Sequence, residues 1–241
     1  MTDVLDWPAL RGHTTARIGL GRVGVSLPTA RHLDFQLAHA RARDAVHAAL
    51  DADGIAAALA RAGHEVLQLR SAAPDRATYL RRPDLGRRLD PALPPALQPH
   101  PCDLAFIVAD GLSAAAVNTQ AAAVVAEVMA ALPPGRVGPV CLVEQGRVAI
   151  GDEIGALLGA ALVVVLIGER PGLSAADSMG AYITYAPAVG TPDARRNCVS
   201  NIRPQGLRLA EAGVTIANVV AAARRHQLTG VALAGRAALL A

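Results

Sequence analysis

Three runs of entirely apolar residues place the strongest limit on how this chain folds. They span Leu104–Ala109, Val140–Val143 and Leu162–Ile167, and each has the length of a strand. Strands that are apolar throughout are typical of a parallel sheet covered on both faces. Because helical segments alternate with the runs, we expect an α/β fold with a doubly wound, mostly parallel, Rossmann-like sheet in the C-terminal part of the chain.

The expected helices of this part have recognisable ends. Ser113 is a favourable N-cap for an Ala-rich helix that reaches Leu132, where Pro133 and Pro134 stop it. A helix should also begin at Asp152, after the second strand, and another should run from about Leu207 to His226.

The N-terminal part is less regular. A helix is predicted from Thr29, with Phe35 and four alanines on one face at spacings of three and four. A short helix at residues 55–62 and a strand at residues 65–69 follow, and residues 71–101 should form an extended connector rich in Pro and Arg. We therefore divide the chain into a helical region with its connector, 1–98, and an α/β domain, 99–241.

The composition excludes several functions. All 23 basic side chains are arginines, so no lysine can form a Schiff base or complete a phosphate-binding P-loop. A net charge of +3 with 2% aromatic residues disfavours nucleic-acid binding. Three dispersed cysteines and no signal-like N-terminus fit the reducing cytoplasm. No apolar run reaches the ~20 residues of a membrane helix, so we expect no membrane association.

A glycine-rich segment, Gly19–Gly24, fits the pattern G-x-G-x-x-G of dinucleotide-binding sites. That pattern requires a preceding strand and a helix that begins on it, and Pro28 follows instead. A loop is the favoured interpretation. A stand-alone nucleotide-binding oxidoreductase stays open as the alternative function.

Three polar segments follow or adjoin the predicted strands, and we expect them to be loops that could meet at one edge of the sheet. Gly168–Ser174 follows the third strand and Gly146–Ile150 the second, so both should reach the edge of the sheet where ligands bind. Arg196–Ile202 is dense in short polar side chains. Each segment has a plainer interpretation: Glu169 in a surface ion pair with an arginine, Val148 in the core, and Cys198 as a small buried apolar residue.

Taken together, the motifs resemble those of the ethanolamine ammonia-lyase small-subunit family. The likeness runs from about Thr14 to near the C-terminus. Its motifs, in chain order, are Tyr79–Leu89, Asp110–Ser113, Gly146–Val148, Gly168–Leu173 and Cys198–Ile202.

This resemblance implies an adenosylcobalamin-dependent lyase that converts ethanolamine to acetaldehyde and ammonia. The small subunit would supply part of the cobalamin site through Val148, Glu169 and Cys198, at the interface with a catalytic large subunit, a β/α barrel that binds the substrate. No catalytic residue and no metal ligand are expected in this chain. The chain lacks D-x-H-x-x-G, so the cofactor's benzimidazole should stay on cobalt.

The resemblance also bears on location and on one further alternative. Members from enteric bacteria carry a longer N-terminal extension associated with bacterial microcompartments, and this chain begins near the shared region. We expect a cytoplasmic hetero-oligomer, with a microcompartment as an alternative location. A structural subunit that contacts no ligand is a third possible function.

Overall fold

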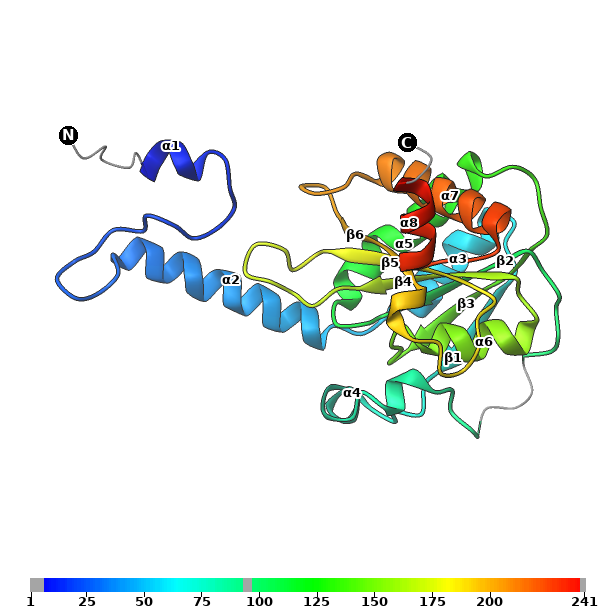
Figure 1. Cartoon of the computed structure of the whole chain (residues 1–241). Coiled ribbons are helices and arrows are strands. Elements are labelled where there is room, and N and C mark those ends of the chain that lie inside the picture. Colours follow the sequence, from blue (N-terminus) through cyan, green and yellow to red (C-terminus); the bar gives the residue numbers. More distant parts are fainter. Residues whose placement is uncertain (1–6, 93–96, 239–241) are drawn as a thin grey trace.

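The computed structural model describes residues 7–92 and 97–238. Its centre is one six-stranded sheet with the strand order β1-β3-β2-β4-β5-β6 (Figure 1). The strands are β1 (Val66–Arg70), β2 (Leu104–Ala109), β3 (Val137–Glu144), β4 (Leu162–Gly168), β5 (Met179–Tyr185) and β6 (Asn197–Ile202). The first four strands in this order are parallel, and β5 is antiparallel to both of its neighbours. The predicted mostly parallel α/β sheet is confirmed.

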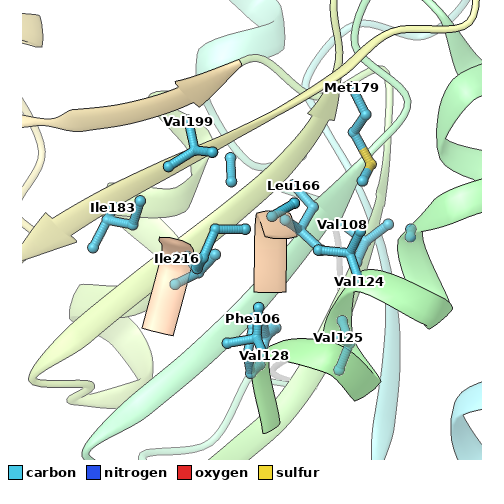
Figure 2. Close-up of a cluster of buried hydrophobic side chains, with 14 of the residues drawn as sticks. Phe106, Val108, Val124, Val125, Val128, Leu166, Met179, Ile183, Val199 and Ile216 are labelled. Carbon is cyan, nitrogen blue, oxygen red and sulfur yellow. The ribbon is translucent and has the colours of Figure 1, made fainter. Parts of the chain in front are cut away.

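One face of the sheet is covered by three helices, α3 (Ala52–Arg61), α5 (Ala114–Ala131) and α7 (Leu209–His226). Their side chains form the main core with alternate residues of the strands, among them Phe106, Val125 and Ile216 (Figure 2). Ser113 caps α5 as predicted, because its side chain accepts a hydrogen bond from the Ala116 amide. By length and composition α5 could cross a membrane, but 44% of it is buried and it packs on the sheet as a core helix.

The opposite face is covered less completely. Here α6 (Ile150–Leu158) packs on β2, β3 and β4, and Ile150 and Ile154 belong to a second core cluster with residues of these strands. Tyr182 of β5 packs only at the margin of that cluster. Tyr182 is half-buried and Cys198 of β6 is exposed. The β5–β6 half of the sheet is therefore open on this face around Tyr182 and Cys198, whereas Thr184 is buried and accepts a hydrogen bond from Arg196.

The N-terminal segments extend away from the sheet (Figure 1). They comprise α1 (Trp7–Arg11) and α2 (Thr29–His47), which begins where predicted. The face of α2 that carries Phe35 and the alanines is mostly not packed against other elements. Ala45 is the only buried residue of the helix, and Phe35 is 39% exposed. β1 and α3 lie before residue 99, yet they belong to the same sheet and core as the later elements.

The Pro/Arg-rich connector is folded over part of its length. It contains α4 (Arg76–Arg81) and the 3₁₀ turn η1 (Leu85–Arg87), so the expectation of an extended connector is wrong for these residues. Residues 93–96, with two of its prolines, lie outside the described residues. The remaining elements are the 3₁₀ turn η2 (Asp193–Arg195) and α8 (Val231–Ala238).

Candidate functional site

Two of the motifs form turns, after β2 and after β4, that contact each other at the carboxyl edge of the sheet. Gly111 has a φ of +57°, and the Leu112 amide donates to the Gly168 carbonyl oxygen at 2.9 Å. A side chain on Gly168 would collide with the carbonyl oxygen of Ser113. The turn after β2 and the turn after β4 are thus in backbone contact, which requires glycine at both positions.

Asp110 connects these turns to the loop after β3. Its Oδ1 accepts from the Gly146 amide at 3.0 Å, and its Oδ2 accepts from Arg76 Nη1 at 3.2 Å. Burial raises the pKa of Asp110 from 3.8 to about 6, although the charge of Arg76 acts in the opposite direction. A buried carboxylate therefore holds α4 and the β3–α6 loop together.

Tyr79 of α4 positions the residue that precedes Val148. The guanidinium groups of Arg76 and Arg147 both stack on its ring, at 4.8 Å and 4.2 Å from the ring centre. The Tyr79 hydroxyl donates to the Gly146 carbonyl oxygen at 3.0 Å, and the Arg147 amide donates to the Gly86 carbonyl oxygen at 2.7 Å. The Tyr79–Leu89 motif thus fixes the loop that carries Arg147 and Val148.

Glu169 is held in place by hydrogen bonds at the end of β4. Its Oε2 accepts a hydrogen bond from Ser178 Oγ at 2.5 Å. The backbone N–H of Asn201 donates to the carboxylate, with its nitrogen 3.3 Å from both oxygens. Asn201 has a φ of +59°, a conformation that asparagine tolerates better than most residues. No arginine forms an ion pair with Glu169 among the described residues, so the plainer interpretation of this side chain is wrong.

Cys198 lies within β6, directly opposite Tyr182 of β5. Two expectations are corrected here: the residue is in a strand instead of a loop, and it is exposed instead of buried in the core. Burial of the thiol, though partial, raises its pKa. Cys198 is therefore mostly a neutral thiol, suited to contact and not to nucleophilic attack.

Two adjoining hollows bring these residues together. The narrow hollow, of about 340 Å³, is lined by Val148, Glu169 and Tyr182 among others. The wide hollow, of about 560 Å³, shares Arg147, Val148 and Tyr182 with it and extends to the loop at residues 189–196. Val148 and Glu169 thus line one depression. Cys198 lies beside it through its contact with Tyr182.

The outer wall of the wide hollow is fixed by a buried ion pair. Arg196 Nη1 and Nη2 donate to the two carboxylate oxygens of Asp152 at 2.6 and 2.7 Å. Arg196 also donates to the Thr191 carbonyl oxygen at 2.6 Å. This bidentate pair attaches the loop that contains η2 to α6.

Comparison with known proteins gives the family. Residues 5–234 match the family described as ethanolamine ammonia-lyase light chain. The chain belongs to this family. Among its relatives, the ethanolamine ammonia-lyase small subunit of Xanthomonas campestris pv. campestris is 54% identical over 94% of this chain and 86% of the relative. The small subunit of Pseudomonas syringae pv. tomato is 53% identical over 97% of this chain and 84% of the relative. The small subunit of Azotobacter vinelandii is 52% identical over 94% of this chain and 87% of the relative.

As an ethanolamine ammonia-lyase small subunit, the chain is part of a carbon–nitrogen lyase. Enzymes of this family depend on adenosylcobalamin, and a small subunit implies a large-subunit partner. The glycine-rich segment Gly19–Gly24 is a loop with neither a strand before it nor a helix beginning on it. The context for a dinucleotide site is missing.

Sequence reasoning missed three residues that line the same hollow as Val148 and Glu169, namely Tyr79, Arg147 and Tyr182. Arg147 precedes Val148 and Tyr79 begins the first motif, so the family motifs could have indicated both residues. Tyr182 carried none, because β5 was not predicted.

Proposed function

We propose that the surface formed by Val148, Glu169 and Cys198 is one side of the adenosylcobalamin site. The large subunit would close the other side and hold the substrate. One observation carries this proposal: Val148 and Glu169 line the same hollow, beside an open half-sheet that presents Cys198 and Tyr182.

The residues present fit such a cofactor. A corrin ring is broad, apolar on its faces and fringed by amides, so its site needs apolar contacts and a few fixed polar groups. Val148 and Tyr182 offer apolar surface in the hollows. Ser178 and Asn201 orient the Glu169 carboxylate, and they leave acceptor capacity for an amide N–H.

The division of labour follows from these residues. When bound, adenosylcobalamin supplies the radical that starts carbon–nitrogen bond cleavage. Val148 and Tyr182 exclude water from their side of the site, and Glu169 orients the bound group by accepting a hydrogen bond. We expect this soluble subunit to act in the cytoplasm, with a bacterial microcompartment as the alternative location.

The experiment compares the same substitution on two faces of the molecule. The chain is co-purified with its large subunit and titrated with hydroxocobalamin, and binding is followed by absorbance. Val148→Asp should weaken binding at least tenfold, because it places a charge against an apolar ligand face. Val214→Asp is the matched control, since Val214 is 52% exposed on α7, across the sheet from α6.

Glu169→Ala provides the second variant, which removes the acceptor without adding a charge. It should weaken binding several-fold and leave co-purification of the two subunits intact. If Val148→Asp and Glu169→Ala both bind hydroxocobalamin as tightly as Val214→Asp does, the proposal is wrong and this chain is a structural subunit without ligand contact.

A further inference from the structure

The wide hollow has an excess of positive charge. Four arginines and two aspartates line it: Arg87, Arg88, Arg147, Arg196, Asp152 and Asp193. Both aspartates bind Arg196, and Arg88 binds Glu153. Arg87 and Arg147 are therefore left without an acidic partner among the described residues.

Arg147 is held in place, but not all of its hydrogen-bond donors have a partner. Its guanidinium stacks on Tyr79 at 4.2 Å, and Nη2 donates to the Tyr79 carbonyl oxygen at 3.4 Å. Its Nε is buried without a hydrogen-bond partner. Buried donors without partners cost free energy and are rare. An arginine held rigidly at a hollow with unused donors is suited to bind an anionic ligand.

Gly86 shows that the position of Arg147 depends on close packing. A Cβ on Gly86 would come 2.8 Å from Arg147 Cγ and 2.9 Å from the Tyr79 ring. The guanidinium thus has little freedom to turn toward solvent. Little conformational entropy would be lost when it binds an anion.

We propose that Arg147, with Arg87 at the same hollow, binds the phosphodiester of the cobalamin nucleotide loop. This assignment rests on the proposed function. Adenosylcobalamin carries one phosphodiester, an anion, in the chain that joins the corrin ring to the benzimidazole nucleotide. Guanidinium groups match phosphate oxygens with paired donors. Because Arg147 adjoins Val148, the contacts to the anion and to the apolar part of the cofactor would come from one loop.

The test compares two corrinoids. Hydroxocobalamin has the phosphodiester, and aquacobinamide lacks the phosphate and the whole nucleotide. Dissociation constants are measured by absorbance titration of the co-purified complex. Arg147→Gln should weaken hydroxocobalamin binding about tenfold or more and leave aquacobinamide binding unchanged. Arg147→Lys keeps the charge but not the paired donors, so it should weaken hydroxocobalamin binding less than Arg147→Gln does.

Arg136→Gln is the matched control, because Arg136 precedes β3 at the opposite edge of the sheet and pairs with Asp103. Equal hydroxocobalamin affinity for Arg147→Gln and Arg136→Gln would overturn the proposal. An equal loss for both corrinoids would also overturn it, since the effect would then be structural. If Val148→Asp weakens both corrinoids while Arg147→Gln weakens neither, the phosphate assignment fails and the proposed function stands.

Discussion

At the scale of single residues, the candidate site consists of side chains whose neighbours have removed most of their freedom. Ser178 and the Asn201 amide hold the Glu169 carboxylate, and Tyr79 holds the Arg147 guanidinium. In both cases some hydrogen-bonding capacity remains unused and lies at a hollow. Such preorganised groups bind a ligand with little additional ordering cost.

The titration of Asp110 should make stability depend on pH. Its pKa in the folded chain is about 6, against an ordinary value of 3.8, because burial disfavours the carboxylate. The folded state therefore binds more protons than the unfolded state between these values. The contribution of Asp110 to stability is fully present below pH 4 and is lost as the pH rises through 6.

Asp110→Asn, which resembles the protonated side chain, tests this dependence. The unfolding free energy of the variant minus that of the unsubstituted chain should rise by about 2 kcal/mol from pH 4.5 to pH 7.5. Urea unfolding of both proteins at the two pH values measures this difference. A stability difference that does not change with pH, or that changes in the opposite direction, would contradict the assigned pKa.

The site residues differed in how far the sequence could place them. Val148 and Glu169 follow predicted apolar strands, so their position at the carboxyl edge could be anticipated. Cys198 could not be placed by the same rule, because β6 was not recognised as a strand. Only Val199 and Ile202 of β6 (Asn197–Ile202) belong to the main core, so the strand has no continuous apolar run.

At the scale of elements, the important feature is the unequal covering of the sheet. α6 has nine residues and covers the parallel strands, whereas β5 and β6 continue beyond it. Of the strands predicted correctly, β2, β3 and β4 are almost entirely buried, whereas the edge strand β1 is partly exposed. The two missed strands, β5 and β6, have polar residues or glycine among their apolar residues, so the continuous apolar run that identifies a central strand is absent from them.

The contact between the turns after β2 and β4 gives a prediction at this scale. Gly168→Ala should destabilise the chain by about 3 kcal/mol, because a Cβ would overlap the carbonyl oxygens of Asp110 and Ser113. Gly172→Ala is the control four residues away, where a Cβ would meet no atom within 4 Å. Urea unfolding measures both variants. Similar free energies of unfolding for the two would show that the turns are not in close contact.

At the scale of the whole molecule, apolar surface is concentrated at the N-terminal end. Eight of the thirteen large apolar side chains that are exposed in the described part of the chain lie at residues 7–37. They belong to α1, α2 and the loop between them, which extend away from the sheet (Figure 1). Apolar surface of this extent is typical of an interface. We expect the large subunit to cover it.

Replacing two of these side chains tests this expectation. Leu33 and Leu37 are 57% and 53% exposed on α2. The double variant Leu33→Asp, Leu37→Asp should weaken association with the large subunit roughly 100-fold, since burial of the exposed half of each leucine is worth about 1.4 kcal/mol. Co-purification and sedimentation measure the association, with Val214→Asp as the control. An unchanged complex would show that this surface has another role.

The main architecture could be derived from sequence because burial on both faces leaves a clear pattern. The arrangement of the site depends on long-range contacts that no local pattern records, such as Tyr79 against Arg147 and Ser178 against Glu169. The family motifs indicated which segments belong together. The structure shows the physical reason, because these segments contact one another at one edge of the sheet.

A structure of the assembled two-subunit enzyme with bound hydroxocobalamin, obtained by electron cryomicroscopy, tests the central claim most directly. The account predicts cofactor atoms in van der Waals contact with Val148, Glu169 and Cys198. A cofactor bound only by the large subunit, or bound on the face of the sheet covered by α5 and α7, would contradict it.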